Sequence, residues 1–121
     1  MEKIKPTEKD LQVIERQLGR VPRDVDAIAY QCPCGNPAVI RTPPRLSDGT
    51  PFPTLYYATC PKLTSAISTL ETTGLMADME SRLQESEELA YRYRQAHISY
   101  LSDRNELGVS VPEVDGITAG G

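Results

Sequence analysis

The chain has 121 residues, of which 39% are hydrophobic and 25% are charged, and its formal net charge is −4 at pH 7. These values are typical of one globular domain with its own core, not of a disordered chain. The acidic balance, the lack of Trp and the single Phe argue against a nucleic-acid surface. No apolar run is long enough to cross a bilayer, and the N-terminus does not have the pattern of a secretory signal. We therefore expect a cytoplasmic protein that binds neither nucleic acid nor a membrane.

The first third of the chain indicates a helix followed by a hairpin. Thr7 can cap a helix in which apolar residues recur every three or four positions, and Gly19 is a natural stop for it. Residues 25–31 and 38–41 have the pattern of two strands. The segment Cys32–Gly35 would then be the tight turn of a hairpin, because Gly and Pro flank the position where the strands must reverse.

A stiff loop is expected over residues 42–54, which are dense in Pro, Gly, Ser, Asp and Thr. Long ordered loops in small domains are often functional. Residues 55–59 favour a third strand that ends at Cys60. Pro61 suits the first turn of a helix, which would place Cys60 at or near its N-cap.

The second half of the chain predicts helices. The apolar stripes Leu63 to Leu70 and Met76 to Leu83 have helical spacing, with Gly74 between them, and we expect both stripes to belong to the core. An acidic entry over Glu85–Glu88 precedes a last helix with a mixed face. That face carries Leu89, Tyr93, His97, Tyr100 and Arg104.

The order of these elements predicts an α+β fold. We expect a single domain over residues 1–106, with a small antiparallel sheet of about three strands and three to four helices. Residues 107–121 have no periodicity and contain several glycines, so we expect a flexible C-terminal tail.

The three cysteines are the sharpest chemical feature, because they lie in two short segments, Cys32-Pro33-Cys34-Gly35 and Cys60-Pro61. An odd number of cysteines in a reducing compartment favours metal binding or redox chemistry over structural disulfides. If the strands are neighbours, the thiols can approach one point. With His97 they make a possible ligand set for zinc or an iron–sulfur cluster. If one position of that site is open, the proline loop and its arginines could form a substrate pocket over it.

Three alternatives stay open for the same residues. Cys60 can be a reactive thiol, because a helix N-terminus stabilises a thiolate, with Cys34 or Cys32 as its resolving partner. The cysteines can also be small buried hydrophobic residues, and His97 a half-buried histidine bonded to a tyrosine or carboxylate. The protein would then be a metal-free interaction module that presents the Tyr93–Arg104 face or the loop to another protein.

Arginines are the candidates for binding a small anionic cofactor or ligand, since their forked side chains match carboxylate and phosphate. Arg45 stands out because it lies within the stiff loop, and Arg104 because it continues the face of His97. Solvated surface charge is the alternative for each of them. We expect the partner to be a protein or a small anion. The other candidate arginines are Arg20, Arg23 and Arg41.

Several motifs also support a family resemblance. They are Val13–Arg23, Cys32–Pro37, Pro44–Leu46, Asp48–Tyr57, Thr59–Pro61 and, more loosely, Ala96–Arg104. Together they resemble the bacterial family called domain of unknown function 501, over roughly residues 11–105. The resemblance implies a bacterial, cytoplasmic single domain. It adds no reaction, because the family has no established activity.

Overall fold

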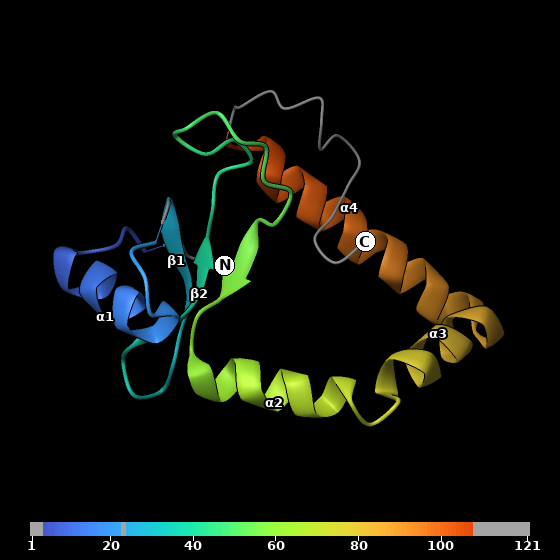
Figure 1. Cartoon of the computed structure of the whole chain (residues 1–121). Coiled ribbons are helices and arrows are strands. Elements are labelled where there is room, and N and C mark those ends of the chain that lie inside the picture. The colour runs from blue at the N-terminus through green and yellow to red at the C-terminus, as the bar shows by residue number, and fades with distance from the viewer. Residues whose placement is uncertain (1–3, 23, 108–121) are drawn as a thin grey trace.

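The computed structural model describes residues 4–22 and 24–107. Within these residues the chain forms four helices and one antiparallel sheet of three strands, which confirms the predicted α+β class (Figure 1). The elements are α1 (Glu8–Leu18), β1 (Ala27–Gln31), β2 (Pro37–Arg41), β3 (Tyr56–Ala58), α2 (Pro61–Glu71), α3 (Leu75–Glu85) and α4 (Glu87–Asn105).

The sheet has the order β1-β2-β3, and both neighbouring pairs are antiparallel. Because the strands alternate in direction, the end of β1, the start of β2 and the end of β3 meet at one end of the sheet. We call this the cysteine end, and it comprises residues 32–37 and 59–60. The opposite loop end comprises residues 41–56, which leave β2 and return to β3. The five residues of β2 separate the two ends by roughly 16 Å.

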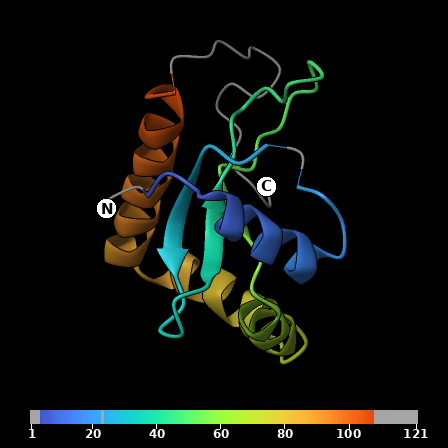
Figure 2. The same ribbon diagram turned by 90° about the vertical axis from the view of Figure 1, so that its left-hand side faces the viewer.

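The core lies between α1 and one face of the sheet. Thr7 caps α1 with its side chain, and Gly19 ends the helix in the left-handed region at φ 76°, as the sequence predicts. Ile14 of α1 packs on Ile28 and Ile40 of the first two strands, and none of the three is more than 2% exposed. Figure 2 shows α1 lying across the sheet from this side. Leu18, Val25 and Tyr57 pack around this cluster.

The C-terminal turns of α4 pack beside the loop end, on the other side of the sheet from α1 (Figure 1). The Tyr100 hydroxyl accepts a hydrogen bond from the N–H of Leu55 at 2.5 Å and donates one to the carbonyl of Pro53 at 3.2 Å. The Tyr100 ring also meets the ring of Tyr56 edge to face, with centroids 5.8 Å apart. These contacts fix α4 to the segment that precedes β3.

Helices α2 and α3 extend away from the sheet, with α3 joining α2 to α4 (Figure 1). None of the described residues in α2 or α3 is buried. Ile67 and Leu70 are 40% and 51% exposed, and Met76 and Met79 are 63% and 51% exposed. The prediction that both apolar stripes belong to the core is therefore wrong for these residues. Helical spacing reveals an apolar face, but neither helix lies over the sheet as α1 does.

The predicted mixed face of α4 is likewise packed only in part. Tyr100 and Arg104 contact the loop end, whereas Leu89 is 40% exposed and Tyr93 is 59% exposed. None of the described helices is both long and apolar enough to span a membrane. The predicted flexible tail lies outside the described residues from position 108 onward.

Candidate thiol site at the end of the sheet

The hairpin turn between β1 and β2 presents two of the three cysteines. The Cys32 N–H donates to the carbonyl of Asn36 and the Gly35 N–H donates to the carbonyl of Cys32, both at 2.8 Å. Pro33 suits the second position of such a turn, and Gly35 supplies the positive φ of 93° that the turn requires. Cys34 therefore stands exposed at the tip of the turn, while Cys32 is half-buried at its base.

The third cysteine reaches the same end of the sheet from β3. Cys60 is the N-cap residue of α2, and Pro61 follows in the first turn, as the sequence predicts. The Cys60 N–H donates to the carbonyl of Ala38 in β2 at 3.3 Å. Its half-buried thiol makes no capping hydrogen bond. All three thiols are free, and their backbones converge on the start of β2 from two distant segments.

The hairpin stabilises negative charge on Cys34. The backbone N–H of Asn36 and the thiol of Cys32 both favour the thiolate, and they lower the pKa of Cys34 below its ordinary value. The positive charge of Lys62, in the first turn of α2, acts in the same direction. Cys34 is therefore the thiol with the environment of a nucleophile.

Cys32 has the opposite tendency. The backbone N–H of Cys34 favours its thiolate, but other influences outweigh this one and raise the pKa of Cys32. They are its hydrogen bond to the Cys34 sulfur, its partial burial and the negative charges of Cys34 and Cys60. Of the two hairpin cysteines, Cys32 therefore tends to remain a thiol while Cys34 becomes the thiolate.

Two buried polar atoms at the cysteine end have no hydrogen-bond partner among the described residues. One is the hydroxyl of Thr59, a residue that is 2% exposed and donates its N–H to Ala38 at 2.9 Å. The other is the amide oxygen of Gln17, whose amide nitrogen donates to the carbonyl of Pro37 at 2.8 Å. Buried polar groups are almost always paired, so these two atoms are exceptions in the packed interior. Sequence reasoning missed both residues because only tertiary packing buries them.

The structure does not assemble the predicted metal ligands. Among the described residues, no three His, Cys, Asp or Glu side chains are arranged so that they could hold a metal ion. His97 lies within α4, half-buried, one turn before Tyr100, which binds the segment preceding β3. Cys60 follows β3 at its other end. The ligand set Cys32, Cys34, Cys60 and His97 stays a prediction.

The predicted anion-binding arginines both belong to the loop end. The guanidinium of Arg45 donates to the carbonyl of Gly49 at 2.8 Å, within the same loop. Arg104 is 4% exposed and donates to the carbonyl of Pro53 at 3.0 Å. The expected pocket of loop arginines over the cysteines is therefore not formed, because β2 separates loop and thiols. Position 23, another candidate arginine, lies outside the described residues.

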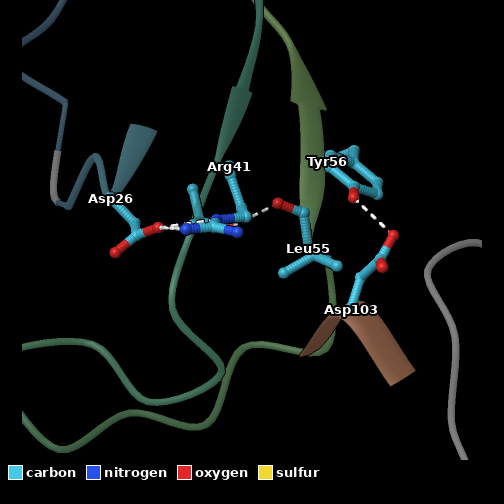
Figure 3. Close-up of polar contacts among 6 residues, drawn as sticks. Asp26, Arg41, Leu55, Tyr56 and Asp103 are labelled. Atoms are coloured by element: carbon cyan, nitrogen blue, oxygen red, sulfur yellow. Dashed lines mark hydrogen bonds and ion pairs between the residues drawn. The ribbon is translucent and has the colours of Figure 1, made fainter. Parts of the chain in front are cut away.

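Two further polar pairs fasten the loop end (Figure 3). Arg41 at the end of β2 pairs with Asp26 before β1, with Arg41 Nε 2.6 Å from Asp26 Oδ2. The Tyr56 hydroxyl donates to the carboxylate of Asp103 in α4 at 2.7 Å. Burial, this hydrogen bond and the negative charge of Asp103 raise the pKa of Tyr56 to about 12. Tyr56 therefore remains protonated at neutral pH and acts as a hydrogen-bond donor, not as a general base.

Comparison with known proteins identifies a family. No curated protein and no solved structure matches the chain. Residues 28–115 match the model of a family described as "Protein of unknown function (DUF501)". The match begins after α1 and extends into the predicted tail, so its limits differ from the expected range at both ends. It spans well over half of the sequence, and the chain belongs to this family.

Proposed function

We propose that the protein acts through the thiolate of Cys34 in thiol–disulfide exchange. The observation that carries the proposal is the position of Cys34 at the exposed tip of a rigid hairpin turn, next to the Cys32 thiol. The Asn36 N–H and Cys32 lower the pKa of Cys34, so that more thiolate forms near neutral pH than in an ordinary cysteine. A reducing compartment, as expected for a cytoplasmic protein, would keep these thiols free.

The three thiols would carry out thiol–disulfide exchange in two steps. The Cys34 thiolate attacks one sulfur of a substrate disulfide, the substrate S–S bond breaks, and the departing thiolate takes a proton from solvent. A second protein thiol, Cys32 or Cys60, loses its proton to solvent and attacks the Cys34 sulfur. This step releases the second substrate thiol, which is also protonated. The substrate is reduced and two protein cysteines are oxidised, and a dithiol reductant returns the protein to its starting state.

Two polar atoms without a partner among the described residues lie at the cysteine end. Thr59 directly precedes Cys60, and Gln17 contacts Pro37, which directly follows the hairpin turn. Both atoms are buried, so a substrate would contact the exposed Cys34 and not these two groups. Lys62 adds a positive charge that favours an acidic substrate surface.

Metal binding is the second candidate function, and the convergence of all three cysteines on one end of the sheet favours it. Thiolates are preferred ligands of zinc and of iron–sulfur clusters. Rotation of the three side chains would be needed to bring their sulfur atoms around one ion. His97 or an external group would supply any fourth ligand.

One experiment separates the two candidates. Protein purified without oxygen or chelator is analysed for metal, then treated with iodoacetamide at a series of pH values, and labelling of each cysteine is followed by mass spectrometry. Exchange predicts no bound metal and a Cys34 that is labelled at lower pH than an ordinary thiol. About one zinc per chain, or iron with sulfide, together with thiols that resist labelling until a chelator is added, would favour the metal site.

A matched pair of variants tests the role of Cys32. Cys32→Ala removes the hydrogen bond to the Cys34 sulfur, so labelling of Cys34 should shift to higher pH, whereas Cys32→Ser keeps a donor and should shift it less. Cys34→Ser should abolish reduction of a small aromatic disulfide. A metal-free protein in which Cys34 is labelled no more readily than an ordinary cysteine would contradict both candidate functions.

A further inference from the structure

A cavity of about 250 Å³ lies at the loop end, away from the thiols. It is open to solvent on one side and is lined by the C-terminal end of α1, the connector after it, β2, β3 and the proline loop. Neither thiol–disulfide exchange nor metal binding at the cysteine end involves this cavity. Its lining residues are Leu18, Arg20, Pro22, Asp24, Ile40, Thr42, Leu46, Phe52 and Tyr57.

The inner wall of the cavity is apolar. Ile40 and Leu46 are 2% and 5% exposed, and the rings of Phe52 and Tyr57 lie with their centroids 6.4 Å apart at an angle of 48°. Two tilted rings over aliphatic side chains fit a flat apolar body. The volume is just below the range of pockets for drug-sized ligands, which indicates a small molecule.

The wall is held in shape by hydrogen bonds of the loop. The Phe52 N–H donates to the carbonyl of Pro44 at 2.7 Å, and the Leu46 N–H donates to Thr50 at 2.9 Å. The buried Thr42 hydroxyl donates to the carbonyl of Thr54 at 2.5 Å. These bonds close the loop on itself, so the cavity is largely preformed, as small-molecule sites usually are.

Among the described residues, the rim carries one cation, Arg20, and one anion, Asp24. Asp24 accepts hydrogen bonds from the N–H and the hydroxyl of Ser47, at 2.9 and 3.2 Å. Arg20 is exposed, and its guanidinium makes no hydrogen bond or ion pair with another described residue. The rim therefore offers the unused donors of a planar guanidinium, which match a carboxylate in two parallel bonds.

We propose that this cavity binds a small aromatic carboxylate, with its ring packed against the paired rings of Phe52 and Tyr57 and its carboxylate on Arg20. The apolar wall takes the ring and the cation at the rim sets the preference for an acid. This site is independent of thiol chemistry, because it lies at the other end of β2 and contains no cysteine.

Phe52 makes a direct test possible, because it is the only phenylalanine of the chain. Full-length protein labelled with 4-fluorophenylalanine gives a single ¹⁹F resonance, located in the cavity wall. This resonance is followed during titration with phenylacetate and, separately, with its neutral analogue phenylacetamide. We expect a saturable shift with phenylacetate and weaker binding of the amide.

Two arginine variants locate the carboxylate. Arg20→Gln should weaken phenylacetate binding about tenfold, as expected for loss of a charge-assisted hydrogen bond, and leave phenylacetamide unchanged. Arg16→Gln is the matched control, because Arg16 is an exposed arginine one turn earlier that does not line this cavity. No response of the ¹⁹F signal, an equal response to acid and amide, or equal weakening in both variants would overturn the proposal.

Discussion

Helices α1 and α2 have the same length, 11 residues, and each carries apolar residues at helical spacing, yet the molecule uses them differently. In α1, Ile14 is completely buried against the sheet. In α2, Ile67 is 40% exposed and no described residue is buried. The helix that lies over the sheet gains its stability from tertiary packing, and the helix that leaves the sheet at Cys60 gains little. An apolar stripe therefore shows which side chains a helix could bury. The arrangement of the strands decides whether those side chains are buried.

The largest expected effect comes from truncating the same residue type in the two helices. Ile14→Ala should lower the free energy of unfolding by about 2–5 kcal/mol, because it leaves a cavity in the core. Ile67→Ala should change it by less than about 0.5 kcal/mol, since the residue is half-exposed and alanine is the better helix former. Urea denaturation of both variants checks the difference. A large loss in Ile67→Ala would show that α2 is buried in solution.

A second, smaller effect compares two arginines of α4. Arg104→Met keeps much of the side-chain volume but removes the charged donor that binds Pro53. It should cost about 1–3 kcal/mol, because the Pro53 carbonyl then keeps only its longer hydrogen bond from Tyr100. Arg92→Met removes an exposed pair with Glu88 one turn away, worth about 0.3–0.5 kcal/mol. Thermal or urea unfolding measures both. Equal losses would mean that α4 is not anchored at its C-terminal end.

The same contrast explains which parts of the fold the sequence predicts. The cap at Thr7, the stop at Gly19, the turn over Cys32–Gly35 and the helix start at Pro61 depend on residues within a few positions of one another, and all four predictions are confirmed. The burial of the stripes in α2 and α3 depends on where the sheet offers a surface. That surface is small, and no local pattern reports which helix will lie over it.

In the candidate thiol site, too, some features could be predicted from local sequence and others required the packed structure. The convergence of the cysteines was predictable, because a hairpin turn and the end of an antiparallel third strand must lie at the same end of a sheet. The preference for Cys34 over Cys60 was not, since it depends on hydrogen bonds to Asn36 and Cys32. The unpartnered hydroxyl of Thr59 also required the packed structure, because nothing in the sequence around it reports its burial.

The smallest effect at neutral pH concerns Tyr56, which joins β3 to α4 through Asp103. Its pKa is raised to about 12 in the folded protein, while an unfolded tyrosine ionises near its ordinary value of 10. The stability that Tyr56 contributes is therefore fully present below about pH 10 and is lost as the pH rises toward about 12. Tyr56→Phe should cost about 1 kcal/mol at neutral pH, the usual worth of one hydrogen bond.

The pH dependence of this difference tests the clamp between β3 and α4 directly. The stability gap between the wild-type protein and Tyr56→Phe should be constant below about pH 10 and should narrow above it. In Asp103→Asn the pKa of Tyr56 should fall only part of the way to its ordinary value, because burial, the largest cause of the shift, remains. Urea unfolding at several alkaline pH values measures the gap, and tyrosinate absorbance follows the titration. A gap that stays constant to pH 12 would mean that the hydroxyl of Tyr56 is neither buried nor held by Asp103, so that α4 would be fixed to the loop end by Tyr100 and Arg104 without Tyr56.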